Sequence, residues 1–63
     1  MYDFLFCLTE HSENEGEYFL YEGDTLKEAI AYLCDEQGFR RNEFRFIERM
    51  SVEEGEMLGL DTY

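Results

Sequence analysis

The first apolar segment, YDFLFCLT at residues 2–9, constrains the fold most, because it is hydrophobic on both faces of an extended chain. One face of this segment is wholly apolar, and it consists of Tyr2, Phe4, Phe6 and Leu8. The opposite face is half apolar, since Leu5 and Cys7 lie between polar neighbours. A strand that is apolar on both faces is typical of the middle of a sheet. We therefore expect residues 2–9 to form a central strand.

Five further segments follow with recognisable patterns. They are a polar loop at 10–17, a strand at 17–21, a helix at 24–38, a strand at 42–50 and a short helix at 51–59. The long helix has apolar residues at helical spacing on one face. Thr25 and Glu28 fit a capping box at its start, Gly38 is a natural left-handed stop, and Phe39 can pack back over the last turn. Ser51 and Glu54 form a second capping box, before a helix that Gly55 weakens and Gly59 ends.

This order of elements predicts an α+β fold with the sequence ββαβα. With residues 2–9 in the centre, the strand order is 2-1-3 and all neighbours are antiparallel. The long helix is expected on the face of Tyr2, Phe4 and Phe6. The 63 residues form a single domain, 1–63, whose core supplies only ~3–5 kcal/mol of net stability.

The charge of the chain is strongly negative, with 16 acidic against 5 basic side chains and a formal net charge of −11. Such a chain is repelled by anionic membranes and by nucleic acid, so we expect it to contact neither directly. The first residues lack a basic leader, and no apolar run reaches the ~20 residues that cross a bilayer. We therefore expect a cytoplasmic protein whose Cys7 and Cys34 are free thiols, with a Cys7–Cys34 disulfide as the alternative.

The stretch FRRNEFRFIERM, residues 39–50, holds four of the five basic residues, interleaved with aromatics. This composition suits a nucleic-acid platform, with arginines on phosphates and Phe44 or Phe46 on bases. The alternative, which we favour, places Phe44 and Phe46 in the core. The arginines then pair with carboxylates of neighbouring strands such as Asp3 or Glu17. Simple alternation puts Phe44, Phe46 and Glu48 on one face and Arg45, Ile47 and Arg49 on the other.

No group of residues predicts catalysis, a metal or a cofactor. Cys7, His11 and Cys34 are the only soft ligand candidates, and they lack the paired spacing of a zinc site. The acidic loop that starts at Glu10 does not match the calcium-loop pattern, which requires glycine at its sixth position. Paired carboxylates such as those at 35–36 and 53–54 fall on exposed helix faces without a cleft. We expect a protein that is not an enzyme.

One further surface is expected if the helix covers a single face of the sheet. The opposite face then keeps an apolar strip of Leu5, Cys7, Ile47 and one of Phe19 or Tyr21, flanked by Arg45 and Arg49. This strip predicts an alternative function, in which the chain is a structural or regulatory protein–protein interaction module. The chain is then a monomer or a weak homodimer.

In size, acidity and element order, this chain resembles the small anti-CRISPR proteins of bacteriophages that act as DNA mimics. The ending VEEGEMLGLDTY is similar to the ends of small phage proteins. The resemblance implies an inhibitor in the cytoplasm of a bacterial host, whose partner is the basic DNA-binding groove of a CRISPR effector subunit. It implies contact through scattered carboxylates, and the exposed candidates are Glu13, Glu15, Glu28, Asp35, Glu36, Glu53 and Glu54.

Overall fold

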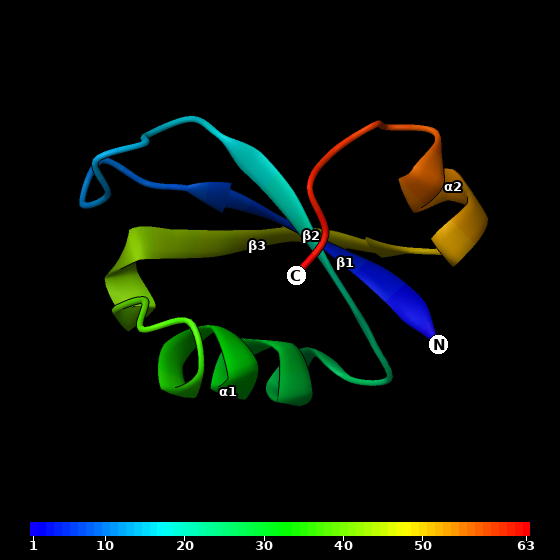
Figure 1. Cartoon of the computed structure of the whole chain (residues 1–63), viewed down its shortest axis with the longest axis horizontal. Coiled ribbons are helices and arrows are strands. Elements are labelled where there is room, and N and C mark those ends of the chain that lie inside the picture. Colours follow the sequence, from blue (N-terminus) through cyan, green and yellow to red (C-terminus); the bar gives the residue numbers. More distant parts are fainter.

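The computed structural model describes all 63 residues of the chain. Its elements are β1 (Tyr2–Leu8), β2 (Tyr18–Gly23), α1 (Leu26–Asp35), the 3-10 turn η1 (Arg41–Glu43), β3 (Phe44–Met50) and α2 (Val52–Glu56). The strands form one antiparallel sheet in the order β2-β1-β3, so the predicted α+β fold and the central position of the first strand are confirmed (Figure 1). The third strand begins two residues later than expected, because residues 41–43 turn before it.

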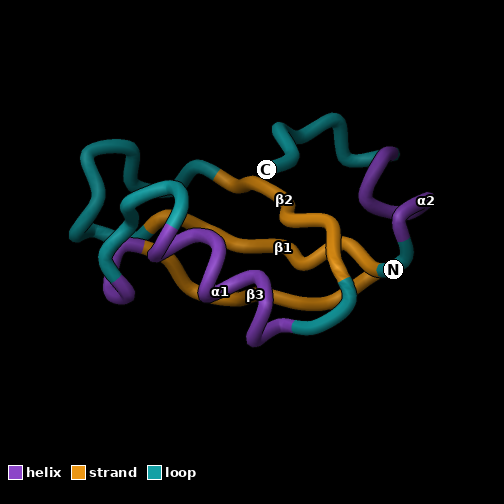
Figure 2. Tube along the Cα trace, turned by 60° about the horizontal axis from the view of Figure 1, so that its bottom comes forward, coloured by secondary structure: helices purple, strands orange, loops and turns teal.

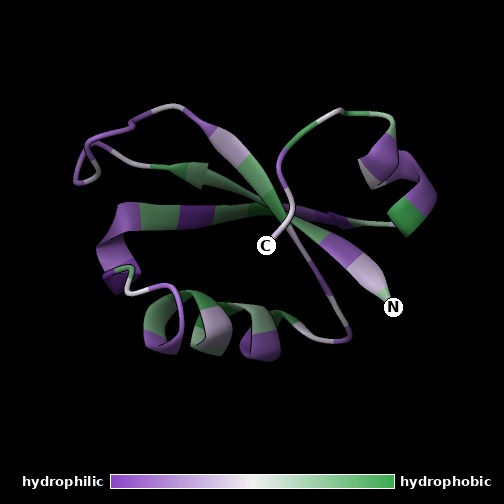
Figure 3. Ribbon diagram, in the orientation of Figure 1, coloured by the Kyte–Doolittle hydropathy of each residue, from purple (hydrophilic) through white to green (hydrophobic).

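The core lies between α1 and one face of the sheet. It is formed by Phe4, Phe6, Leu8, Phe19, Tyr21, Ala29, Leu33 and Phe44. Phe6 is fully buried, and its ring lies 5.5 Å from the rings of Phe19 and Phe44. Figure 3 shows hydrophobic residues gathered in the strands and on α1, while the loop between β1 and β2 is hydrophilic. The aromatic side chains therefore build most of the core of this small domain.

The two ends of α1 are fixed largely as the sequence predicts. The Thr25 hydroxyl accepts a hydrogen bond from the Glu28 N–H at 3.1 Å, so Thr25 is the N-cap. The predicted capping box is only half formed, because the Glu28 carboxylate accepts a hydrogen bond from the Tyr21 hydroxyl instead. Gly38 adopts φ +77°, and Phe39 then stacks on Phe19 with ring centres 5.9 Å apart.

A β-bulge interrupts the pairing of β1 with β3. Phe6 pairs with Phe46, but Leu5 pairs with Glu48, so Ile47 is the extra residue. Beyond the bulge the alternation is reversed: Glu48 lies on the face of Leu5, and Arg49 pairs with Phe4 on the face of α1. The expectation from simple alternation was therefore wrong for Glu48 and Arg49, because a single inserted residue exchanges the faces of all that follow.

The C-terminal part of the chain packs on the sheet. The chain end lies beside β2 (Figures 1 and 2), where Leu20 donates a hydrogen bond to the Asp61 carbonyl and accepts one from the Tyr63 N–H. The helix α2 is shorter than predicted and ends at Glu56, and it packs on β1 so that Gly55 is buried against Asp3. The helix α2 thus covers part of the face opposite α1, whereas the Tyr63 ring packs on the core side, 5.0 Å from the ring of Phe19.

Candidate partner-binding surfaces

The negative charge of the chain lies almost entirely at its surface. Asp3 is the only buried charged residue. Carboxylates lie within 4.0 Å of a basic group at two places only: Asp24 lies 3.6 Å from the N-terminal amino group, and Glu10 lies 3.8 Å from His11 Nε2. No arginine or lysine side chain forms an ion pair. The acidic surface is therefore not neutralised within the molecule and is available to an external cation.

The seven carboxylates predicted to contact a partner are all exposed, but they do not form a single patch. Glu13 and Glu15 lie in the loop between β1 and β2, which occupies one end of the molecule in Figure 1. Glu53 and Glu54 lie on α2 at the opposite end, Glu28 and Asp35 lie on α1, and Glu36 is the C-cap of α1. The molecule measures 30 × 21 × 15 Å. A partner that touches all seven residues must therefore extend along its full length.

Two of these seven carboxylates also hold local structure. Glu54 accepts hydrogen bonds from the backbone N–H and the hydroxyl of Ser51, at 3.4 and 3.0 Å, and so completes the predicted capping box of α2. Glu28 Oε2 accepts the hydrogen bond of the Tyr21 hydroxyl at 2.8 Å. This hydrogen bond, together with burial, raises the pKa of Tyr21 to about 12, because the neutral phenol is the donor. Asp35 and Glu36 have no such role, and they are the freest acids on α1.

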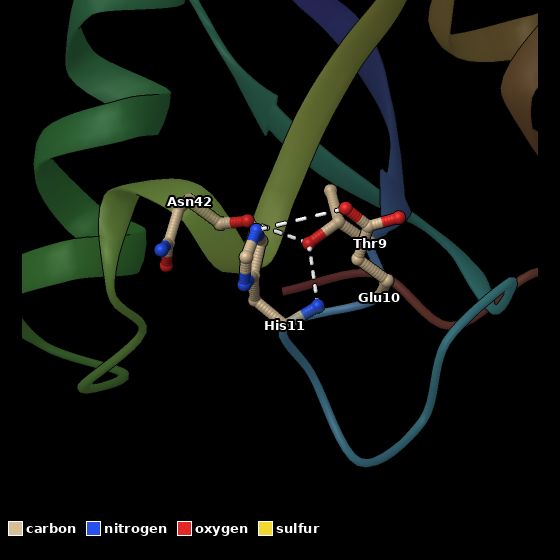
Figure 4. A network of polar contacts seen from close by, with 4 residues as sticks. All are labelled: Thr9, Glu10, His11 and Asn42. Carbon is tan, nitrogen blue, oxygen red and sulfur yellow. Dashed lines mark hydrogen bonds and ion pairs between the residues drawn. The ribbon is translucent and has the colours of Figure 1, made fainter.

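The loop between β1 and β2 is joined to the start of β3 by a small polar network (Figure 4). The Thr9 hydroxyl donates a hydrogen bond to the Asn42 carbonyl at 2.5 Å and accepts one from the His11 N–H at 3.2 Å. His11 also approaches Glu10. An open groove beside this network is lined by residues that include Cys7, Tyr18 and Arg45.

The groove does not assemble a reactive or metal-binding set. Cys7 is buried, and its thiol donates to the Leu8 carbonyl at 3.5 Å, while His11 is exposed on the loop. Cys34 is half-buried on α1, and both cysteines are free. No group of three His, Cys, Asp or Glu side chains is arranged to hold a metal ion. The role of the polar network is therefore structural: the hydrogen bonds of Thr9 hold the loop that carries Glu13 and Glu15 against the start of β3.

The basic strand differs from both sequence interpretations. Phe44 is buried as predicted, but Phe46 is 37% exposed. The expected ion pairs with Asp3 or Glu17 are absent, because Asp3 lies under α2 and no carboxylate comes within 4.0 Å of an arginine. Two arginines instead lie over aromatic rings: Arg41 is 5.1 Å from the centre of the Phe44 ring, and Arg49 is 4.3 Å from that of Tyr2. The arginines thus remain available along β3.

The apolar strip predicted opposite α1 is largely covered. Cys7 is 5% exposed and Leu5 and Ile47 are half-buried, while Phe19 and Tyr21 lie in the core beneath α1. No local pattern predicted that α2 would pack on this face, because the helix is short and its contact with Asp3 joins residues far apart in the sequence. The expectation of an open apolar face was therefore wrong.

Asp3 is the most unusual residue on this covered face. It is 3% exposed, and its Oδ1 atom has no hydrogen-bond partner. Burial raises the pKa of its carboxyl group above the usual value of 3.8, and the nearby charges of Glu22 and Glu56 raise it further. Asp3 therefore opposes the packing of α2 when it is ionised.

The comparisons with known proteins add no relative. No family model, curated protein or solved structure matches this chain. The structure contains no helix that is both long enough and apolar enough to span a bilayer.

Proposed function

We propose that this protein is a non-enzymatic inhibitor that binds the basic nucleic-acid-binding surface of a host defence complex and excludes DNA from it by charge and bulk. A CRISPR effector subunit is the proposed target, and the bacterial cytoplasm is the proposed site of action. The observation that carries the proposal is the exposed acidic surface, which has almost no internal counter-charge. A surface with unneutralised charge attracts an oppositely charged partner and speeds its encounter.

The spacing of the carboxylates supports binding in a groove made for DNA. Helical residues rise by about 1.5 Å each, so side chains four positions apart lie ~6 Å apart along the axis. Phosphates on one strand of B-DNA follow each other every ~3.4 Å along the axis. Glu28 and Asp35 on α1 are seven positions apart, which is about 10.5 Å along the axis and close to three such phosphate steps.

The alternative, an interaction module that uses the sheet face opposite α1, receives less support. Its central residues are buried or half-buried, and α2 packs on this face. They therefore offer a partner little exposed apolar surface. The acidic surface is exposed, and it is therefore the better candidate.

The experiment is affinity capture from a CRISPR-bearing bacterial lysate at low salt, followed by elution with duplex DNA and then with high salt. We expect one nucleic-acid-binding protein to be released by both. Reversal of Glu28, Asp35 and Glu36 to lysine should weaken its binding and flatten the salt dependence. The double variant D35K/E36K makes the same test while leaving the Tyr21–Glu28 hydrogen bond intact.

A matched control is the double variant E10K/E17K, which changes the net charge equally at two exposed acids outside the seven predicted contacts. If D35K/E36K weakens binding more than this control, the α1 patch is the contact. If the two are equal, net charge alone carries the affinity. A partner that resists both DNA and salt contradicts the proposed function.

A further inference from the structure

The strand β3 presents a free edge to solvent. It is an outer strand of the sheet, and its outer side has no backbone hydrogen bond. The other outer strand, β2, is partly occupied by the chain end through the pairing of Leu20 with Thr62. The only outward-facing backbone group of β3 that forms a hydrogen bond is the Phe44 carbonyl, which accepts one from the Arg41 side chain at 3.5 Å. Free strand edges are templates for pairing with another strand.

The hydrogen bonds of β1 show which groups of β3 point outward. Leu8 exchanges hydrogen bonds with residues 16 and 17 near β2, so the even-numbered residues of β1 bond toward β2 and the odd-numbered ones toward β3. Phe44, Phe46 and Arg49 pair with even-numbered residues of β1. Their own N–H and C=O groups therefore point away from the sheet. The bulge at Ile47 explains why these outward residues change from even to odd numbers.

We propose that two copies of this chain associate edge to edge through β3, antiparallel, about a two-fold axis between Phe46 and Ile47. In this register Phe44 of one copy pairs with Arg49 of the second, and both have outward backbone groups. Because each bulge reverses the alternation, the side chains of Phe44 and Arg49 lie on one face and those of Arg45 and Glu48 on the other, while the central pair, Phe46 with Ile47, spans the bulge. A shift of one residue in either direction would bring side chains from opposite faces together.

The charges of β3 are complementary in this same register. Arg45 of each copy lies opposite Glu48 of the other, and both residues are exposed on the same face. Neither has an ion-pair partner within its own chain. This position is a non-hydrogen-bonded pair, in which facing side chains come closest. The two-fold axis repeats the ion pair, so the interface gains it twice.

The flanks of β3 extend this complementarity. The basic turn with Arg40 and Arg41 precedes β3, and the acidic first turn of α2, with Glu53 and Glu54, follows it. Antiparallel pairing brings the start of one strand beside the end of the other. A second copy therefore fits this edge better than a uniformly acidic or uniformly basic partner, because acids and arginines alternate along it.

The association does not depend on the proposed function, but it would refine it. Pairing through β3 places Arg45 in the interface and leaves an outer surface that is more uniformly acidic. The two copies carry −11 each and repel one another, so the association is weak and is best measured with salt present. Loss of the dimer and loss of target binding can then be measured separately on the same variants.

The first test is analytical ultracentrifugation of the full chain in about 0.3 M salt, where the Debye length is under 8 Å. We expect a monomer–dimer equilibrium that Arg45→Glu and Glu48→Arg each weaken roughly tenfold or more, since like charges then face one another. The exchanged variant R45E/E48R restores the pair and should restore the dimer. Lys27→Glu on α1 makes the same charge change as Arg45→Glu and should leave the dimer unchanged.

The second test is amide hydrogen exchange as a function of protein concentration. The outward N–H groups of Phe44 and Arg49 should become protected as the concentration rises, while that of Arg45, which faces β1, is protected throughout. A chain that stays monomeric with exposed edge amides overturns the proposal. A dimer that ignores both single reversals, or that R45E/E48R fails to restore, overturns it as well.

Discussion

Glycine normally weakens a helix, but Gly55 allows α2 to pack closely against Asp3 on β1. Replacing Gly55 with alanine tests which of these two effects is larger. In an isolated helix, glycine to alanine stabilises by about 1 kcal/mol. In this structure a Cβ at Gly55 would overlap Asp3 Oδ2 and lie 2.7 Å from Asp3 Cγ and 2.9 Å from Asp3 Cβ. Asp3 is buried between α2 and its neighbours on the sheet, so it cannot move away freely. Gly55→Ala must therefore displace α2 from β1.

The expected magnitude follows from these opposing terms. Overpacking of a buried contact costs typically ~1–3 kcal/mol, and the gain in helix propensity is about 1 kcal/mol, so the net cost lies at roughly 0–2 kcal/mol. Because Asp3 Cβ, which cannot rotate away, would lie 2.9 Å from the new Cβ, we expect Gly55→Ala to fall in the upper part of this range, at roughly 1–2 kcal/mol of the ~3–5 kcal/mol available to a domain of this size. The assay is urea denaturation followed by far-UV circular dichroism.

Two controls make the result specific. Asp3→Ala removes the carboxylate that the new Cβ would meet, so Gly55→Ala should cost less in that background, and a double-mutant cycle measures the coupling. Glu53→Ala, an exposed change in the same helix, should alter stability by no more than about 0.5 kcal/mol. If Gly55→Ala stabilises the protein by the full helix-propensity increment, α2 does not pack on β1 and the reasoning is refuted.

Three further predictions concern the core and two perturbed acids. Asp3→Asn should stabilise the protein at neutral pH, because it removes the penalty for burying a charged carboxylate. The difference in stability from wild type should shrink as pH falls through the raised pKa of Asp3 toward 3.8, since the carboxyl is then protonated in both the folded and the unfolded chain. Denaturation at several pH values measures this difference, and a constant difference contradicts the prediction. Tyr21→Phe should lower the free energy of unfolding by ~1–2 kcal/mol, because it removes the hydrogen bond to Glu28. A spectrophotometric titration of the variant should lack the phenol that titrates at about 12 in wild type. The stability that this hydrogen bond contributes is present below pH 10 and is lost as pH rises through 12. Phe6→Ala should remove ~3–5 kcal/mol, about the whole net stability, so its circular dichroism should show an unfolded chain, and a cooperative folded variant would count against the assigned core.

The acidic surface and the β3 edge connect the two proposals. The arginines gather on the one strand edge that is open to pairing, whereas the carboxylates are spread over the rest of the surface. An edge that closes by self-association removes basic side chains from the surface offered to a basic target. Comparing target binding by wild type and R45E would show whether the dimer contributes to it.

Local sequence patterns determined the elements and their order. The apolar residues on both faces of residues 2–9 predicted a central strand, and β1 pairs with β2 on one side and with β3 on the other. Thr25, Ser51 and Gly38 marked helix ends, since caps and left-handed stops are set by backbone groups within a few residues. The exposure of the acidic residues also followed from their type, because ionised side chains remain in water.

Only the tertiary structure decided how the faces of the sheet are used. The alternation of side chains along a strand cannot reveal the extra residue at Ile47. This residue places Glu48 and Arg49 each on the face opposite to the one that simple alternation predicts. The same change gives the edge of β3 the register in which Arg45 and Glu48 of two copies are complementary. Gly55 was indistinguishable from a helix-weakening glycine, because the atom that requires it, on Asp3, lies more than fifty residues away in the sequence. Which carboxylates share a surface was likewise set by the arrangement of α1, α2 and the loop in space, and such non-local contacts leave no trace in a local pattern.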